Sequence, residues 1–476
     1  MIDRAMQSSD ANLTLVEEIT HAISPFAALE KLSHLPHAVF LDSSARHHQL
    51  GQASYVAADP FQVLKSPVGQ IDDLHKVDRE LEKFVTPTVE NLPSFQGGAV
   101  NFCSYDLKRC FESIPLATDE FEMPDLFVGF YDVVISFDHV RNRTWLISQG
   151  FPEIEPAKRR VRAEQRLAEF KDLLTSTRMI QRIPTRINSI AASNLVPQKK
   201  SAISSKLTSN FSKSEFVAAV QRGIDYIYEG DIFQVNLSQR LLAKQEFDSL
   251  TLYQKLREQN AATFSVFLDL GEFQILSSSP ERLLSVDREN HLETRPIKGT
   301  RQRSCYPEAN LFLAEGLITS EKDRAENVMI VDLLRNDLSK ICEDDSIHVS
   351  QLCGLEEYQF VQHLVSVIRG HINCEHRFTK IFSAIFPGGS ITGAPKVRAM
   401  EIIAEIEGVA RGAYCGSVGY FSFDGAIDQN ILIRTISAGR GWCQIPVGGG
   451  IVSQSDPLSE YEETVHKAHG MVRAIF

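Results

Sequence analysis

The sequence predicts an α+β fold built on largely antiparallel sheet, and three observations lead to this fold class. Helical runs, strand-like runs and glycine-rich turns alternate from about residue 212 to the end of the chain. Their spacing lacks the repeat of about 30 residues that βαβ units give in a doubly wound parallel sheet. A length of 476 residues, of which 43% are hydrophobic and 23% charged, is sufficient for a large buried core.

The individual elements can be placed from their patterns. Residues 38–41 and 128–137 read as strands, and residues 156–174 read as a charged helix. Residues 176–212 are rich in Ser, Thr, Asn and Lys and show little apolar periodicity, which is typical of an exposed connector. Beyond them, Ser212 or Ser214 can cap a helix that runs through Ile227 and ends at Gly230, and residues 231–238 read as the strand that follows.

Charge and cysteine usage limit the partners and the compartment. A net charge of −12 argues against nucleic acid and against an anionic membrane surface as partners. The eight cysteines form no C-x-x-C pair and have no histidines at zinc spacing, so we expect reduced thiols. The N-terminal segment lacks a basic start followed by an apolar core, and no apolar run approaches the ~18 residues of a membrane span. We therefore expect a cytoplasmic protein with no membrane contact.

One lysine lies at the end of a predicted strand. Residues 292–295 alternate as a strand, and Pro296 cannot continue a central strand, so the chain is expected to turn through Gly299. Lys298 then lies at the mouth of the turn, either as a solvated charge or as a nucleophile. A nucleophilic role requires a desolvated site or neighbouring cations that lower the pKa of the amine. Glu281, one strand earlier, is a candidate general acid beside it.

Two predicted helices carry carboxylates that can bind a metal. Ser320 opens the first helix, in which Glu326 shares a face with Ile330 and Leu333. A carboxylate on an apolar face must be paired, for example with an arginine, or must bind a metal ion.

The second of these helices is the last in the chain and follows Asp456-Pro457. Its Glu460, Glu463 and Lys467 lie opposite an apolar seam, which taken alone indicates a solvated face. The seam consists of Leu458, Tyr461, Val465, Ala468 and Val472.

Two glycine-rich stretches can bring backbone amides to a ligand. Residues 386–396, FPGGSITGAPK, lack the Gly-Lys-Ser/Thr ending of a phosphate-binding loop. They lead into a helix from Pro395 through Glu407, whose first N–H groups can face an anion. Gly448–Gly450 either allow close approach of a ligand or form a hairpin turn or bulge. Arg434, after a strand-like run, can bind a carboxylate with two hydrogen bonds.

Two short segments connect these features to a known family. The segment Ser279-Pro280-Glu281-Arg282, followed by Pro296-Ile297-Lys298-Gly299-Thr300, resembles the chorismate-utilising enzymes. The resemblance is strong from about residue 211 to residue 471 and faint before. A lysine at the position of Lys298 marks the branch of this family that aminates chorismate at C4 to 4-amino-4-deoxychorismate, in 4-aminobenzoate and folate synthesis. The sister branch, anthranilate synthase component I, has alanine there.

The resemblance also implies the layout of the chain. It implies two stacked, mainly antiparallel sheets flanked by helices, in an α/β/β/α arrangement. Residues 1–175 would complete the shared core, residues 176–212 would form the exposed connector, and residues 213–476 would form the chorismate-binding catalytic region.

The family's site residues can be carried onto this chain position by position. Lys298 would add to C2 of the substrate ring while Glu281 protonates the departing 4-hydroxyl. A Mg²⁺ ion on the substrate carboxylate would be held by Glu326 and Glu463, with Glu460 close by. The family's isochorismate and salicylate synthases activate water with a lysine where this chain has Gln234, which argues against water as the nucleophile. The pocket would be lined by Gln234, Thr300, His363, Thr392, Gly393, Tyr420, Arg434, Gly448, Gly449, Gly450 and Lys467.

The cysteines indicate where the nitrogen comes from, and two alternative functions remain open. No cysteine lies in a glutaminase nucleophile elbow, so a separate glutamine amidotransferase subunit is implied as the supplier of ammonia. The first alternative is anthranilate synthase component I, which aminates chorismate at the ortho position and eliminates pyruvate. The second alternative is a non-catalytic subunit that binds chorismate without turnover.

Overall fold

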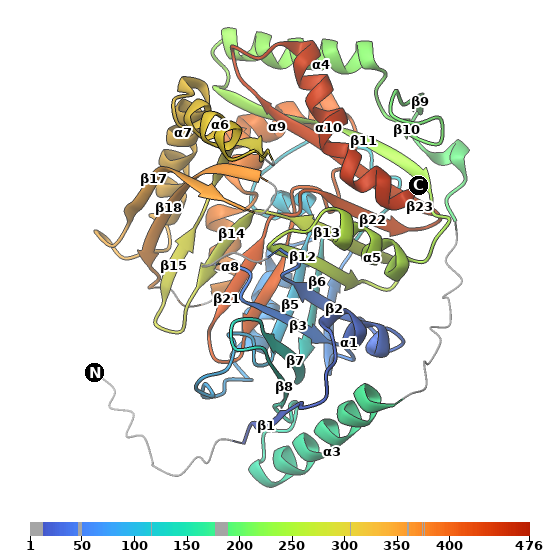
Figure 1. The fold of residues 1–476 in the computed structure, drawn as a ribbon, viewed down its shortest axis with the longest axis vertical. Coiled ribbons are helices and arrows are strands. Elements are labelled where there is room, and N and C mark those ends of the chain that lie inside the picture. Colours follow the sequence, from blue (N-terminus) through green and yellow to red (C-terminus); the bar gives the residue numbers. More distant parts are fainter. Residues whose placement is uncertain are drawn as a thin grey trace.

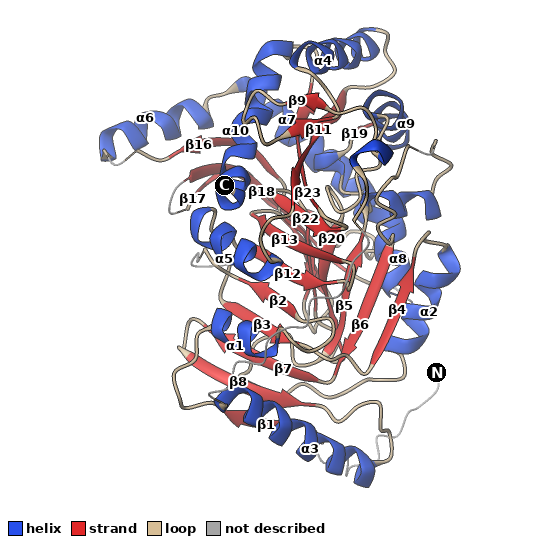
Figure 2. Ribbon diagram, turned by 90° about the vertical axis from the view of Figure 1, so that its right-hand side faces the viewer, coloured by secondary structure: helices blue, strands red, loops and turns tan. Residues whose placement is uncertain are grey.

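Two antiparallel sheets form the centre of the molecule (Figures 1 and 2). The computed structural model describes residues 13–45, 50–115, 117–176, 189–304, 306–358, 361–373, 375 and 377–476. Neighbouring strands within both sheets are paired antiparallel. The predicted α+β fold with two stacked, mainly antiparallel sheets is therefore confirmed.

The larger sheet combines strands from the whole chain. Within the described residues its strand order is β1 (Leu15–Glu18), β8 (Arg143–Ser148), β7 (Val133–Asp138), β3 (Ala53–Ala57), β2 (Val39–Asp42), β12 (Phe264–Asp269), β13 (Phe273–Ser279), β22 (Thr435–Gly439), β23 (Trp442–Ile451), β11 (Gln234–Lys244), β10 (Thr208–Ser209) and β9 (Lys199–Lys200), with β19 (Gly393–Ala394) also paired to β11.

The smaller sheet has the same mixed origin. Its strand order in the described chain is β16 (Ile297–Gln302), β18 (Val361–His371), β15 (His291–Thr294), β14 (Arg282–Val286), β21 (Ile427–Asn430), β20 (Ser417–Ser422), β5 (Gly98–Cys103), β6 (Leu126–Tyr131) and β4 (Gln62–Ser66), with β17 (His348–Glu357) paired to β18. Early and late parts of the sequence meet where β2 pairs with β12 and where β5 pairs with β20.

Helices cover the outer face of each sheet, and among the described residues three large apolar clusters fill the layers, beside a small fourth one formed by Leu317, Cys353 and Leu364. One cluster lies between the sheets and includes Val266 of β12 and Phe127 of β6. A second packs α1 (Pro25–Leu32), α3 (Pro156–Thr175), α5 (Ser249–Gln259) and α10 (Pro457–Ile475) on the larger sheet. The third packs the smaller sheet and β11 against α2 (Ile71–Leu81), α4 (Lys213–Tyr228), α7 (Glu321–Leu338), α8 (Arg377–Ile385) and α9 (Lys396–Glu407). The remaining helical elements are α6 (Pro307–Ile318), η1 (Tyr105–Cys110), η2 (Ala192–Asn194) and η3 (Gly389–Ile391).

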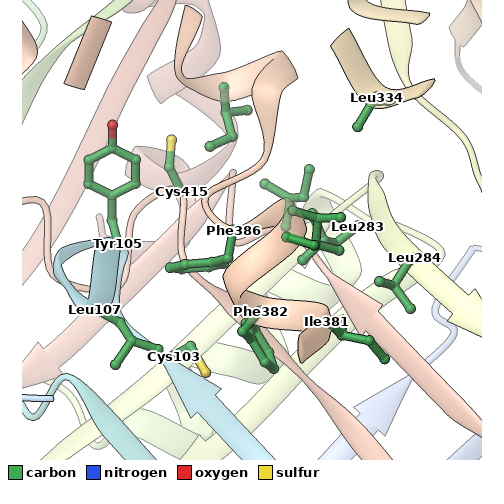
Figure 3. Close-up of a cluster of buried hydrophobic side chains, with 14 of the residues drawn as sticks. Cys103, Tyr105, Leu107, Leu283, Leu284, Leu334, Ile381, Phe382, Phe386 and Cys415 are labelled. Carbon is green, nitrogen blue, oxygen red and sulfur yellow. The ribbon is translucent and has the colours of Figure 1, made fainter. Parts of the chain in front are cut away.

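The third cluster supports the elements that carry the polar residues of interest. Figure 3 shows Leu283 of β14, Leu334 of α7 and Phe386, which follows α8, within this cluster. Glu281 and Ser390 lie a few residues along the chain from Leu283 and Phe386. Their positions therefore depend on a well-packed interior.

Local signals placed several helix ends correctly. Ser212 caps α4 with a full capping box, and the hydroxyl of Ser320 accepts a hydrogen bond from the Asp323 N–H at the start of α7. Asp456 caps α10 in the same way, and Gly408 ends α9 in the left-handed conformation. No helix in the described part of the chain is both long enough and apolar enough to cross a membrane.

Two expectations for the first half of the chain differ from the structure. Residues 128–137 do not form one strand, because β6 and β7 belong to different sheets and the chain crosses between them at Asp132, which is buried. The connector predicted over residues 176–212 is partly docked on the larger sheet. Residues 189–212 contain η2, β9 and β10, and they bury Leu207 in the core under the helices. The rest of that stretch, residues 177–188, lies outside the described residues.

Candidate active site

A cavity of about 430 Å³ opens where α7 and α10 approach the strands β16 and β23. Its lining includes residues from both sheets, so the layered core sets its shape. Twelve of the residues proposed from the sequence line this cavity: Glu281, Lys298, Thr300, Glu326, His363, Arg434, Gly448, Gly449, Gly450, Glu460, Glu463 and Lys467.

Lys298 lies in a strand rather than in a turn. The strand β16 continues along β18 after Pro296, and the pairing register shifts between Lys298 and Thr300. Gly299 sits at this bulge with φ of 76°, a conformation that glycine adopts without strain. A Cβ atom there would lie 2.7 Å from the side chain of Leu317 on α6. The expected turn is thus a β-bulge packed against a helix.

The Lys298 amine faces the cavity from a desolvated position. Its Nζ donates a hydrogen bond to the Ser390 carbonyl oxygen at 3.2 Å. Burial lowers the pKa of this amine, and the carboxyl groups of Glu326 and Glu281 act in the opposite direction. Lys298 is thus a half-buried strand residue rather than a fully solvated loop charge.

Glu281 lies between β13 and β14 and is only 5% exposed. Its Oε1 accepts a hydrogen bond from the Ser390 hydroxyl at 2.9 Å. Burial raises the pKa of this carboxyl group, against the hydrogen bond from Ser390 and the charge of Lys298. The amine and the carboxyl group thus shift toward their neutral forms, and one residue, Ser390, contacts both.

Carboxylates from α7 and α10 approach the same cavity. Glu460 is 7% exposed and accepts a hydrogen bond from the Ser455 hydroxyl at 2.7 Å, so it does not lie on a solvated helix face. Glu463 pairs with Lys467 at 2.6 Å, and Glu326 lies 4.0 Å from Lys322. Burial raises the pKa values of Glu326 and Glu460.

These carboxylates provide the type of donor that a hard divalent cation needs. Among the described residues, no three His, Cys, Asp or Glu side chains stand close enough together to chelate a metal ion by themselves. Mg²⁺ does not require such a cage, since it commonly takes one or two carboxylates together with waters and substrate oxygens. Glu326, Glu460 and Glu463 line one wall region of the cavity and fit that pattern.

Cationic and neutral donors also line the cavity. Arg434 has a positive φ of 53°, and its guanidinium makes no hydrogen bond to the described part of the protein. Such strain in a non-glycine residue is typical of functional sites. Burial, together with the charge of Arg434, lowers the pKa of His363 to about 4, so this imidazole is neutral near pH 7. Its Nδ1 is 2.9 Å from the Thr300 hydroxyl oxygen.

The three glycines Gly448–Gly450 lie inside β23 and pair with β11. A Cβ atom on Gly448 would lie 2.4 Å from the Leu237 carbonyl oxygen. One on Gly450 would lie 3.0 Å from the amide nitrogen of Gln234 and 3.8 Å from Nζ of Lys298. These glycines form neither a hairpin turn nor a loop, and they keep one wall of the cavity free of side chains.

Four proposed residues do not line the cavity. Gln234 is fully buried behind Gly450, and its side-chain amide has no hydrogen-bond partner in the described structure. Thr392 donates its hydroxyl hydrogen to the Gly388 carbonyl oxygen, and Gly393 pairs with β11, so both hold the glycine-rich stretch in place. Tyr420 lines a separate cavity of about 460 Å³ and stacks on Phe95.

Several lining residues were missed by the sequence reasoning. Ser390 lies in the middle of the glycine-rich stretch, where its position directly after Gly388-Gly389 and before Gly393 was the available signal. Tyr414 takes the place in the cavity that had been given to Tyr420, and nothing local distinguishes the two tyrosines. Others that line the cavity are Asn236, Lys322, Ile433 and Met471.

Comparisons with known proteins agree with the arrangement. The family model described as chorismate binding enzyme matches residues 36–473. The chain is 37% identical to aminodeoxychorismate synthase component 1 of Salmonella typhimurium, over 93% of this chain and 94% of the relative. It is 38% identical to anthranilate synthase component 1 of Thermus thermophilus, over 81% and 79% of the two chains.

A solved structure shows the same fold. Anthranilate synthase component I from Streptococcus pneumoniae matches with a TM-score of 0.73 and 30% identity, covering 89% of this chain and 92% of that one. With 438 consecutive positions matched by the family model, from residue 36 to residue 473, and the predicted motifs gathered in one cavity, the chain belongs to the chorismate-binding enzyme family.

Proposed function

We propose that this protein aminates chorismate at C4 to form 4-amino-4-deoxychorismate, with ammonia supplied by a glutamine amidotransferase subunit. The observation that carries the proposal is the pairing of Lys298 and Glu281 across Ser390 in a desolvated cavity. An amine with a lowered pKa and a carboxyl group with a raised pKa, side by side, are suited to act as nucleophile and general acid.

The proposed chemistry proceeds in two displacements. The neutral amine of Lys298 forms a bond to C2 of the ring, the ring double bonds shift toward C4, and the C4–O bond breaks. Glu281 gives its proton to the departing oxygen, so that water leaves, and its carboxylate then takes the surplus proton from the lysine nitrogen. Ammonia next bonds to C4, the double bonds shift back, and the C2–N bond breaks. Glu281 returns its proton to the lysine nitrogen, which leaves as the neutral amine, and then takes a proton from the new ammonium group on C4, so the net exchange is hydroxyl for amino.

Substrate binding uses the remaining groups of the cavity. Arg434 and the cationic end of Lys467 can hold a carboxylate, and neutral His363 with Thr300 can donate or accept hydrogen bonds at uncharged oxygens. A Mg²⁺ ion held by Glu326 and Glu463, with Glu460 close by, would neutralise the charge of a substrate carboxylate.

The partner is inferred from the relatives and from the chain itself. Four curated relatives that match 91–94% of this chain are named component 1 of aminodeoxychorismate synthase, which supports a second component. The absence of a glutaminase nucleophile elbow from the sequence supports a partner that releases ammonia from glutamine.

Anthranilate synthase component I is the second candidate, because a relative and a solved structure of that name match the chain at 38% and 30% identity. Lys298 is the feature that separates the two. A lysine that occupies C2 blocks that position and leaves C4 for ammonia, whereas a small residue leaves C2 open. The presence of the lysine in the cavity favours amination at C4.

The function itself is tested by product analysis of the wild-type chain. With chorismate, Mg²⁺ and an ammonium salt at a pH where free ammonia is present, we expect 4-amino-4-deoxychorismate as the product by chromatography. With glutamine as the nitrogen source, the lone chain should be inactive. Formation of anthranilate as the main product would support the second candidate, and turnover with glutamine would contradict the need for a partner.

The metal site is tested by Glu463→Gln. Loss of this carboxylate should reduce turnover by at least about 10²-fold, and chelation should abolish the activity of the wild type until Mg²⁺ is restored. Its ion pair with Lys467 is half exposed, so the melting temperature should change little. Glu462→Gln, at the neighbouring exposed position, is the matched control and should retain activity. Full activity in excess chelator would contradict the assignment.

The role of Lys298 is tested by the products of Lys298→Ala. We expect a fall in the rate of C4 amination of roughly 10²-fold or more, with part of the nitrogen entering at C2 because that position is no longer occupied. Lys322→Ala removes another lysine from the same cavity and should keep the product at C4. An alanine variant at position 298 that forms the C4 product at the wild-type rate would show that the lysine serves only as a charge.

A further inference from the structure

We infer that Ser390 is a positioning residue that orients both reacting groups, its hydroxyl setting the acid Glu281 and its carbonyl setting the amine Lys298. This inference rests on the proposed function, because it assigns Ser390 a part in the same two displacements. Ser390 is the described residue that bonds both groups, and it lies inside the cavity itself.

The hydroxyl of Ser390 determines which oxygen of Glu281 carries the acidic proton. Its O–H donates to Oε1 at 2.9 Å, and a carboxyl oxygen that accepts this bond is the poorer place for a proton. The proton of neutral Glu281 is therefore placed on Oε2. When Glu281 gives this proton to the substrate, the same hydroxyl stabilises the resulting carboxylate, which makes Glu281 a stronger acid.

The carbonyl of Ser390 orients the nucleophile. A neutral lysine amine has two hydrogens and one lone pair, and one hydrogen is used in the 3.2 Å bond to the Ser390 oxygen. This bond fixes the position of Nζ relative to Glu281, so that the nitrogen and the acidic proton act on the same substrate from a fixed separation. Holding reacting groups in place in this way is a main source of catalysis.

The backbone at Ser390 is itself held from three sides. Arg411, which is buried and paired with Glu407, donates from Nη1 to the Ile391 carbonyl oxygen at 3.3 Å. Thr392 donates its hydroxyl to the Gly388 carbonyl oxygen at 2.9 Å, and its own carbonyl accepts from the Asn236 N–H. A Cβ atom on Gly389 would lie 2.4 Å from Leu333 of α7, so this glycine lets the η3 turn approach the helix.

The glycine-rich stretch therefore has a role other than the anion binding expected from its sequence. It places one serine, by both its side chain and its backbone, between Lys298 of β16 and Glu281 of the turn that precedes β14. Other charged or titratable groups that act on Glu281 in the described structure are Lys298 of β16, Lys467 of α10 and the thiol of Cys415, and the Ile297 N–H also donates to its carboxyl group. None of these would be removed by a change at position 390.

The test is the protonation of Glu281 in Ser390→Ala. Loss of the hydroxyl removes a bond that stabilises the ionised carboxyl group, so Glu281 should remain protonated to a higher pH, by about one pH unit. The carboxyl C=O stretch in pH-dependent infrared difference spectra of the free protein measures this, with Glu281→Gln identifying the band. In the pH profile of kcat/KM, the apparent pKa assigned to Glu281 should rise by the same amount. The apparent pKa assigned to Lys298 should not change, because the backbone carbonyl of residue 390 is still present in the variant.

Matched variants separate positioning from stability. Ser390→Thr retains the hydroxyl and should restore the wild-type midpoint. Thr392→Val removes a hydroxyl from the same turn without touching Glu281, and it should leave the midpoint unchanged even if the melting temperature falls. If Ser390→Ala does not fold, Ser390→Cys, whose thiol is a weak donor, gives the same measurement.

An unchanged Glu281 midpoint in Ser390→Ala, or in Ser390→Cys where the alanine variant does not fold, would overturn the inference. The infrared readout needs no turnover, and so this result is distinct from a failure of the proposed function, which would appear as a different product from the wild-type chain. A midpoint that shifts in Ser390→Ala and Thr392→Val alike would also overturn it, because a general loosening of the turn would then explain the effect.

Discussion

The desolvation of an amine and a carboxyl group in one cavity is the constraint on which the rest of the site depends. Burial acts on Lys298 and Glu281 more strongly than the attraction of the charged groups around them, which offsets it only in part. A buried charge without compensation costs several kcal/mol, so each group shifts toward its neutral form. In the proposed reaction, the same change that relieves the cost of burial would supply a nucleophile and an acid, so the proposed chemistry follows from where the fold places these two side chains.

The fold can hold this arrangement because the site is built on the interior of two sheets. The bulge at Gly299 aims Lys298 at β23, whose glycines leave room for it, while Glu281 directly precedes β14, whose Leu283 packs in the same cluster as Phe386 (Figure 3). The carboxylates come from helices packed on both layers, α7 on the smaller sheet and α10 on the larger. Groups from distant parts of the chain therefore meet at fixed positions, as orientation in catalysis requires.

Structural features that depend on neighbouring residues could be predicted from the sequence, whereas features that depend on long-range packing could not. The caps Ser212, Ser320 and Asp456 and the stop at Gly408 act through neighbouring residues, so their helices could be placed in advance. The burial of Glu460 could not be predicted from the sequence, because it depends on the packing of α10 against strand β23 rather than on the pattern of residues within the helix. Likewise, Tyr414 precedes β20 and Tyr420 lies within it, and which of the two lines the cavity depends on how that segment packs in three dimensions. The crossing at Asp132 follows from sheet assignment rather than from strand propensity.

The central claim is that the Lys298 amine bonds to the substrate ring. The most direct measurement is peptide mapping by mass spectrometry of the wild-type protein, quenched after incubation with chorismate and Mg²⁺ but without ammonia. The second displacement cannot occur under these conditions, so we expect the first product to accumulate as an adduct of chorismate minus water on the peptide that contains Lys298. An unmodified peptide, in protein that turns over normally when ammonia is added, would contradict the covalent route.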